Sequence, residues 1–193
     1  MSVPAPGKLA AIVLTLITSL MALPVRAGEA LDEHALKAAF LYNFAKFITW
    51  PDSAWTGSEA PFRIGIVGND PFGQAFADAL SKRSLHRRSI ALVHVSTVTE
   101  IDQCQMVYFH EAPPPLVRNA LQEVRSRPVL TIGDDRGFAV GEGMIGFIPE
   151  DDGRIRFAIN TTHAHQAGLQ VSSELLRLAE VISSDDSSAG VSP

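Results

Sequence analysis

His163 and His165 are the residues whose types most suggest chemistry, because closely spaced histidines often bind metal ions. The sequence around them is typical of a helix start, however, and side chains two residues apart on a helix point about 200° away from each other. No cysteine or carboxylate pattern stands beside them to complete a ligand set. The sequence therefore predicts no metal site.

A nucleophile beside a base is also missing from the sequence pattern. The Ser-Ser-Glu run at 172–174 and the pair Asp134-Asp135 do not form a catalytic set, and no G-x-S-x-G motif occurs. Residues 65–68 (GIVG) end a predicted strand but lack the full G-x-G-x-x-G motif, so we interpret them as a tight turn. We expect no catalytic residues and no cofactor, and a hydrolase is the least favoured class of function.

Three polar residues are better placed to line a crevice for a small ligand. Asn69 and Asp70 follow the first predicted strand, and His110 ends the third. Parallel sheets bind ligands outside the carboxyl ends of their strands. These side chains are therefore candidates for a pocket.

The element that precedes these strands is an unusually aromatic helix. Residues 35–50 are predicted to be helical, and Pro51 ends the helix because it removes a donor and biases the preceding residue away from helical geometry. Lys37 and Asn43 fall inside its apolar arc. Lysine can extend its amine to water, whereas a buried amide such as Asn43 needs partners, either nearby backbone groups or a pocket. The apolar stripe consists of side chains at helical spacing, namely Leu36, Phe40, Phe44 and Phe47.

Strand-like and helix-like segments alternate along the rest of the chain. This alternation predicts an α/β fold: a single three-layer domain whose mixed, mostly parallel sheet of about six strands is flanked by helices. A last helix is expected from Thr161 to about Ile182, and the basic run at 82–88 is expected to be a solvated loop. The predicted strands are 62–67, 90–95, 106–110, 129–132, 144–149 and 154–160.

The first residues have the features of a secretory signal peptide. Lys8 precedes an apolar run at 9–23, and Val25-Arg26-Ala27 fits a cleavage site. The run is shorter than the roughly 20 apolar residues of a membrane-spanning helix, so cleavage near Ala27 is favoured over an anchor. We expect an exported, periplasmic protein. The predicted organisation is a signal peptide at 1–27, an α/β domain at 28–182 and a disordered tail at 183–193.

Charge and cysteine content narrow the function further. The formal net charge is −5, and removing the signal peptide with its two cations, Lys8 and Arg26, gives −7. An acidic protein of this kind is not expected to bind nucleic acid. The single Cys104 allows no internal disulfide, and we expect a buried thiol, with an intermolecular disulfide as the alternative.

The order of several motifs resembles the YfiR-like family of exported proteins. The resemblance covers most of residues 36–182 and rests on KAAFLYNFAKFITWP, FRIGIVGNDPFG, IDQCQMVYF and the run at 127–182. It implies a periplasmic repressor that binds the sensor region of an inner-membrane diguanylate cyclase, forms dimers and is sequestered by an outer-membrane lipoprotein. Redox-tuned relatives carry cysteine pairs, so the lone Cys104 argues against disulfide control here.

The function predicted from the sequence is therefore that of a non-catalytic regulator. By binding a membrane diguanylate cyclase it would lower cyclic di-GMP signalling and biofilm formation, and a periplasmic small-ligand binding or sensor protein is the alternative. Trp, Tyr and Arg are enriched at the centres of protein interfaces. On that basis the candidate partner-binding residues are Tyr42, Trp55, Arg83, Arg87 and Arg88.

Overall fold

Strands and helices alternate along the part of the chain that the computed structural model describes, residues 27–183. Residues 1–26 of the predicted signal peptide and 184–193 of the predicted tail lie outside the described residues. The elements are α2 (Ala27–Phe47), β1 (Ile48–Thr49), η2 (Asp52–Ala54), β2 (Phe62–Gly68), α3 (Gly73–Ser81), β3 (Ser84–Leu85), β4 (Arg88–Val95), α4 (Val98–Ile101), β5 (Met106–His110), α5 (Pro114–Val124), β6 (Leu130–Gly133), α6 (Arg136–Val140), β7 (Ile145–Pro149), β8 (Ile155–Asn160), α7 (Thr161–Gln166), β9 (Gln170–Val171), α8 (Ser173–Leu176) and β10 (Glu180–Ile182).

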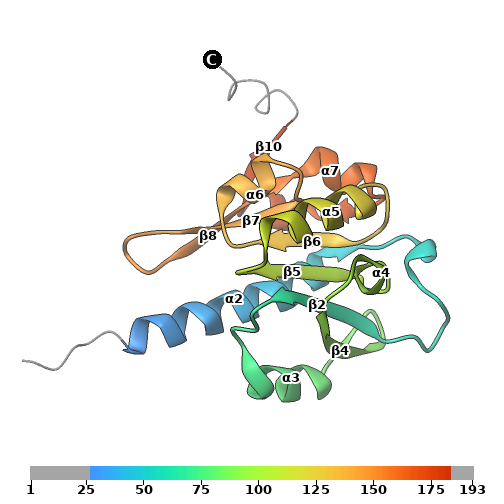
Figure 1. Cartoon of the computed structure of the whole chain (residues 1–193), viewed down its shortest axis with the longest axis horizontal. Coiled ribbons are helices and arrows are strands. Elements are labelled where there is room, and N and C mark those ends of the chain that lie inside the picture. Colours follow the sequence, from blue (N-terminus) through green and yellow to red (C-terminus); the bar gives the residue numbers. More distant parts are fainter. Residues whose placement is uncertain (1–26, 184–193) are drawn as a thin grey trace, which may run out of the picture. The chain divides into compact units, whose positions relative to one another are not determined.

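The main sheet has eight strands in the order β10-β8-β7-β6-β5-β2-β4-β3 (Figure 1). All neighbouring strands run parallel except the pairs β3–β4 and β7–β8. The predicted mixed, mostly parallel sheet is confirmed. The two strands beyond the expected six, β3 and β10, lie at its two edges, where short strands carry too few residues to leave a clear sequence pattern.

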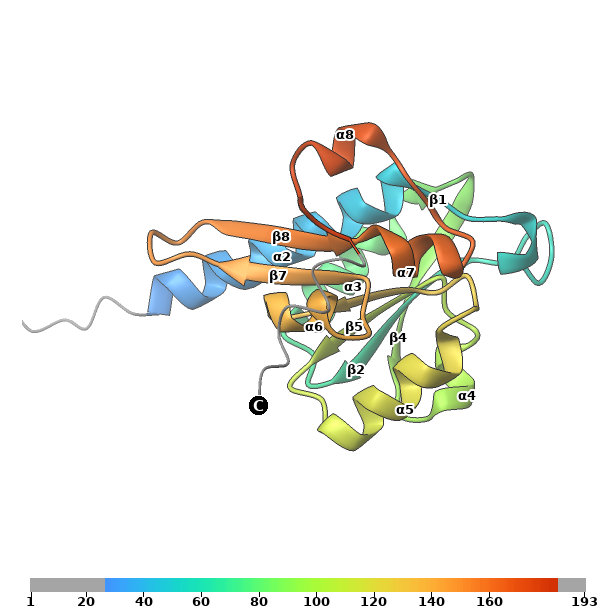
Figure 2. The same ribbon diagram turned by 90° about the horizontal axis from the view of Figure 1, so that it is seen from above.

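Two hydrophobic cores cover the two faces of this sheet. On one face α2 packs with Leu80 of α3 over Ile64 and Ile66. On the other face α4 and α5 pack against the alternate side chains of β2 and β5, such as Val67 and Val107. Helices α2 and α8 lie on one side of the sheet and α4 and α5 on the other (Figure 2). The predicted three-layer architecture is therefore correct.

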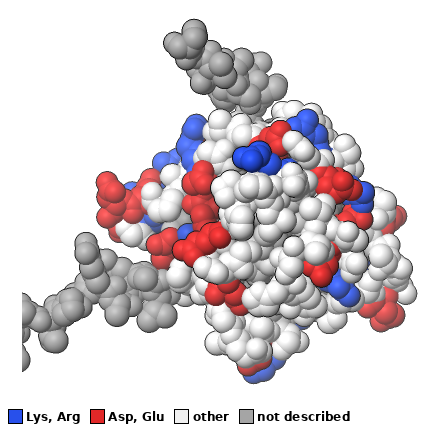
Figure 3. Space-filling model, viewed as in Figure 1, with Lys and Arg blue, Asp and Glu red and all other residues white. Residues whose placement is uncertain are grey.

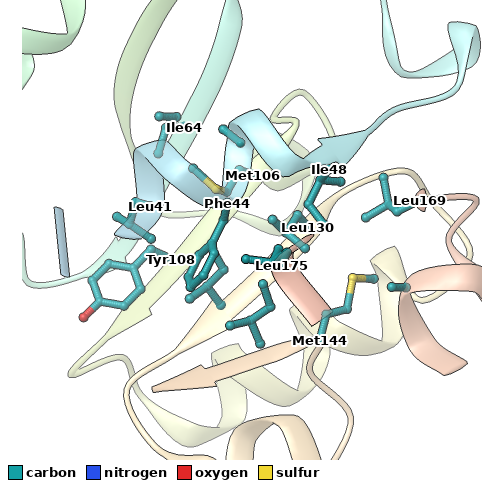
Figure 4. Close-up of a cluster of buried hydrophobic side chains, with 14 of the residues drawn as sticks. Leu41, Phe44, Ile48, Ile64, Met106, Tyr108, Leu130, Met144, Leu169 and Leu175 are labelled. Carbon is teal, nitrogen blue, oxygen red and sulfur yellow. The ribbon is translucent and has the colours of Figure 1, made fainter. Parts of the chain in front are cut away.

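The buried face of α2 is rotated from the predicted stripe by about one residue. Leu41, Phe44 and Ile48 are at most 1% exposed and pack into the core shown in Figure 4. Because these residues set the centre of the buried face, Asn43 points outward and is exposed. The prediction that its amide is buried is therefore wrong. Lys37 is instead buried, at 4% exposure, and does not extend to water as predicted.

The C-terminal end of α2 also differs from the prediction. The helix ends at Phe47, three residues earlier than expected, because Ile48 and Thr49 leave it to pair with β9. The indole of Trp50 is buried and donates a hydrogen bond to the carbonyl of Gln105 at 3.0 Å. Pairing with β9 thus ends the helix before Pro51 can.

The predicted long helix at 161–182 is wrong. Helix α7 ends at Gln166, and Gly168 then adopts a positive φ of 74°, which reverses the chain. Ser172 caps the short α8 by accepting a hydrogen bond from the backbone N–H of Leu175. These breaks let β10 return to the sheet beside β8.

The basic run at 82–88 is a hairpin and not an open loop. Strands β3 and β4 pair through Leu85 and Arg88, and the two residues between them have φ values of 51° (His86) and 66° (Arg87). Two consecutive positive φ angles define the tight turn that matches the twist of a hairpin. The turn contains no Asn-Gly or Asp-Gly pair that would have predicted it from the sequence.

Candidate functional site

Asn69, Asp70 and His110 do lie together, at the carboxyl edge of the sheet. Strand β2 has β4 on one side and β5 on the other, so the chain changes direction across the sheet at this point. The backbone N–H of Asn69 bonds the carbonyl of His110 at 3.0 Å. The Asn69 side chain donates to Glu111, and Asp70 accepts from the backbone N–H of Phe72. Asn43 does not join them, because it lies on the outer face of α2.

A second polar group lies beside these residues, beneath the N-terminal half of α2. Asp134, directly after β6, accepts hydrogen bonds from Lys37 (2.9 Å), from the hydroxyl of Tyr108 and from Nδ1 of His110. Lys37 also pairs with Glu33 one turn earlier, at 2.8 Å. We call Glu33, Lys37, Tyr108, His110 and Asp134 the carboxyl-edge cluster. In Figure 4 the hydroxyl of Tyr108 points away from the apolar core.

The charges of this cluster stabilise one another. Burial alone would lower the pKa of Lys37, but hydrogen bonds and charges from Glu33 and Asp134 outweigh it and raise that pKa above its ordinary value. Burial alone would raise the pKa of Asp134, but hydrogen bonds from Tyr108, Lys37 and His110 outweigh it and lower that pKa. Burial and the neighbouring carboxylate raise the pKa of Tyr108, so its hydroxyl stays a donor. The cluster is therefore a network in which each charge is stabilised by its neighbours.

This arrangement is suited to holding elements in place. It ties α2 to the ends of β5 and β6, and the ammonium of Lys37 also lies 5.7 Å from the ring of Phe147. Among residues 27–183, no three His, Cys, Asp or Glu side chains are arranged to hold a metal ion. Two members could have been anticipated from the sequence: a lysine inside an apolar helix face needs a buried anion, and Asp134 follows a buried strand.

The five candidate partner-binding residues gather on one surface, around the β3–β4 hairpin and the C-terminal half of α2. The guanidinium of Arg83 lies 4.9 Å from the ring centre of Tyr42, and that of Arg88 lies 4.1 Å from Trp55. We call Tyr42, Lys46, Trp55, Arg83, Arg87 and Arg88 the hairpin face. Lys46 belongs to the same surface, since its ammonium lies 6.0 Å from the same Tyr42 ring.

The members of the hairpin face divide into two kinds. The Nη1 atom of Arg88 donates to the carbonyls of Gly57, Ser58 and Ala60 at 2.7–2.9 Å, so this side chain holds the loop before β2. Trp55 is half-buried against it. Arg83 and Arg87 are exposed, and neither has a carboxylate partner among the ion pairs of residues 33–183.

The tip of the β7–β8 hairpin, by contrast, carries several acidic side chains. Figure 3 shows them on the face that includes the tip of the β7–β8 hairpin. Glu150 and Asp152 at this tip pair with Arg154. Acidic side chains at this tip are therefore paired with arginines, in contrast to the unpaired cations of the hairpin face.

Cys104 is buried, as expected, at the opposite edge of the sheet. It is 2% exposed, and burial raises the pKa of its thiol to about 11. It lines one side of a cleft of about 370 Å³ at the amino ends of the strands, together with Arg63 and Gln105. A thiol with this pKa is almost wholly protonated at neutral pH and is a poor nucleophile.

The two histidines of the last predicted helix do not form a site. His163 bonds the carbonyl of Gly143 through Nδ1 at 3.0 Å, whereas His165 is exposed. The backbone N–H of His163 is itself capped by the side chain of Asn160. His163 therefore ties the start of α7 to the loop before β7.

The geometry so far describes an α/β domain with a hydrogen-bonded polar network at one edge and an exposed cationic surface at another. No helix within residues 27–183 is long and apolar enough to cross a bilayer. Comparison with curated proteins finds no match. The profile of the YfiR/HmsC-like family matches residues 34–180, which is most of the chain. The chain therefore belongs to the YfiR/HmsC-like family, and this membership indicates a periplasmic regulator of diguanylate cyclase signalling.

Proposed function

We propose that this protein binds the periplasmic sensor region of an inner-membrane diguanylate cyclase and holds the cyclase inactive. Cyclic di-GMP in the cytoplasm, and with it biofilm formation, would fall as a result. The family match over residues 34–180 is the single observation that carries this proposal. The protein would act as a binding module and not as an enzyme.

Repression of this kind has a definite energetic requirement. The protein must bind the inactive conformation of the cyclase more tightly than the active one, since equal affinity for both would shift nothing. Shifting the cyclase from mostly active to mostly inactive takes roughly 5 kcal/mol of differential affinity. That amount is within reach of one ordinary protein interface.

The domain organisation belongs to the same proposal. A signal peptide at 1–27 would direct export, residues 28–182 would form the regulatory domain, and 183–193 would be a flexible tail. The working form would be a homodimer, and an outer-membrane lipoprotein would compete for it.

Deleting the gene in its host tests the proposal directly. Cellular cyclic di-GMP should rise in the deletion strain. A plasmid copy with the signal peptide should return it to the parental level, whereas a copy without residues 1–27 should not. Unchanged cyclic di-GMP in the deletion strain would contradict the proposal. Purified residues 28–193 should also bind the isolated periplasmic region of the affected cyclase.

A second candidate function is small-ligand binding at the carboxyl edge. The observation that favours it is that Asn69, Asp70 and His110 gather at the point where ligands bind in parallel sheets. Native mass spectrometry of protein purified from the periplasm should then show a bound metabolite. An Asn69→Ala variant should no longer carry the bound metabolite. If the parent protein carries no metabolite either, ligand binding is contradicted and only the regulatory function remains proposed.

A further inference from the structure

We infer that the hairpin face docks an acidic segment of a partner polypeptide through Arg83, Arg87 and Lys46. This inference rests on the proposed function only in requiring a protein partner. It adds which surface is used and what chemistry the partner presents.

The charges of the hairpin face set it apart from the rest of the surface. Four other arginines have carboxylate partners: Arg125, Arg127, Arg154 and Arg156. The exposed Arg118 on α5 and Arg177 after α8 have no such partner among residues 33–183, but they stand on different elements, whereas the hairpin face gathers several unpaired cations on one surface. Arg83, Arg87 and Lys46 have none among residues 33–183. Three exposed cations without counter-ions, on a protein of net negative charge, form a surface complementary to carboxylates.

Two of these cations are held in position by the half-buried ring of Tyr42. The guanidinium of Arg83 lies 4.9 Å from the ring centre, and the ammonium of Lys46 lies 6.0 Å from it. An arginine restrained on an aromatic ring loses less side-chain entropy when its planar fork binds a carboxylate. The geometry therefore favours a specific acidic segment over a diffuse counter-ion atmosphere.

The third cation is displayed by a strained turn. Arg87 has a φ of 66°, a region that side chains other than glycine rarely adopt. The turn is fixed to α2, because Nε2 of His86 bonds the carbonyl of Ala45 at 2.8 Å. Since glycine would suit this position better for stability alone, an arginine here indicates a role for its side chain.

A membrane surface fits these observations less well than a polypeptide does. The large exposed apolar side chains of the described residues are Leu36, Leu178 and Val181, and none lies on the hairpin face to enter a bilayer. The negative net charge would also oppose approach to anionic lipid. A third possibility is that the cations only protect the edge strand β3 from pairing with other chains.

Photo-crosslinking in the host periplasm distinguishes these cases. A photoreactive phenylalanine analogue is placed at exposed Ser84, within the hairpin, and in a matched chain at exposed Gln122 on α5, which covers the opposite face of the sheet. Crosslinked peptides are then identified by mass spectrometry. We expect position 84 to capture one segment rich in Asp and Glu, with little capture at position 122.

Charge-reversal variants complete the test. Arg83→Glu and Arg87→Glu should each lower the crosslinking yield about tenfold, whereas Arg118→Glu, an exposed arginine on α5, should leave it unchanged. Thermal unfolding of each variant checks its fold, and Arg83→Gln replaces Arg83→Glu if the latter is destabilised.

Each outcome decides the inference. The inference would be overturned if position 84 captured lipid or a second copy of this chain. It would also be overturned if the yield at position 84 did not exceed that at position 122, and the cations would then serve only to protect the edge strand. Capture of an acidic segment from a protein that is not a diguanylate cyclase would support the docking surface and contradict the proposed function.

Discussion

The carboxyl-edge cluster and the hairpin face use the same residue types in opposite ways. In the cluster, Lys37 is buried and bonds two carboxylates, and Asp134 accepts from three donors. On the hairpin face, Arg83 and Arg87 are exposed, and Arg83 lies over the neutral ring of Tyr42. The first region therefore satisfies its charges internally, while the second leaves them available.

This difference separates stability from recognition. A charge that is buried and fully bonded costs much to disturb, because removing one partner leaves the others unpaired in a poorly solvated place. An exposed cation costs little to remove, because water replaces whatever it touched. Mutations in the two regions should consequently affect different measurements, and the following predictions run from the largest expected effect to the smallest.

Replacing Asp134 should give the largest loss of stability. Asp134→Ala removes the shared acceptor of Lys37, Tyr108 and His110 and leaves three buried or half-buried donors without it. We expect the free energy of unfolding to fall by about 2–4 kcal/mol. Urea unfolding followed by tryptophan fluorescence measures this change.

The exposed Asp151 provides the matched control. It stands at the tip of the β7–β8 hairpin, so Asp151→Ala should change the free energy of unfolding by less than about 0.5 kcal/mol. Equal effects of the two substitutions would show that the cluster does not stabilise the fold.

The cluster should also make stability depend on pH. Hydrogen bonds from Tyr108, Lys37 and His110 outweigh burial and hold the pKa of Asp134 below its ordinary 3.8, so its contribution is present above that pH and is lost as the pH falls through the lowered value. The pKa of Lys37 is raised above 10.5, so its contribution is complete below that pH and is lost as the pH rises through the raised value.

Urea unfolding between pH 3 and 11 tests this dependence. The difference in stability between the parent protein and Asp134→Ala should be full between about pH 5 and 9 and should shrink below about pH 4. If the difference in the free energy of unfolding stays constant down to pH 3, the charge of Asp134 does not contribute to stability.

The two regions also differ in how far the sequence predicted them. Alternating strands and helices gave the layers and the mostly parallel sheet, because these patterns depend on burial of side chains close in sequence. The carboxyl-edge cluster joins residues 97 positions apart, Lys37 and Asp134, and no local pattern encodes that contact. Of its members, only His110 was predicted to contribute to a site.

Elements formed by few residues were also the hardest to predict. The hairpin turn at His86 and Arg87 contains no glycine that would indicate it in the sequence. Ile48 was predicted to be helical, but it pairs with β9 in a strand of only two residues. Asn43 was misplaced because a shift of one residue in the buried face of a helix moves every position by about 100°. The five partner-binding candidates chosen from composition do lie on one surface, although Tyr42, Trp55 and Arg88 are half-buried there. Their role in binding stays a prediction.

Arg88 tests where the boundary between the two regions lies. It belongs to the hairpin face by position, but it bonds three carbonyls and stacks on Trp55. We expect Arg88→Ala to lower the free energy of unfolding by about 1–2 kcal/mol. Arg83→Ala, the control, should cost less than about 1 kcal/mol because that side chain only lies on Tyr42. Equal values in urea unfolding would place Arg88 with the exposed cations.

Arg87→Gly should separate stability from recognition most sharply, although its effect on stability is the smallest. Glycine adopts a φ of 66° without strain and is favoured at this turn position, so the free energy of unfolding should rise by about 0.5–1 kcal/mol. The same substitution removes a cation from the hairpin face, so capture of the acidic segment by a photoreactive residue at position 84 should fall.

Gly153, at the β7–β8 turn, has a φ of 79° and provides the reverse control. Gly153→Ala should lower stability and leave that capture unchanged, because its turn lies among acidic side chains. A stabilised Arg87→Gly variant with undiminished capture would show that the strained turn does not serve binding.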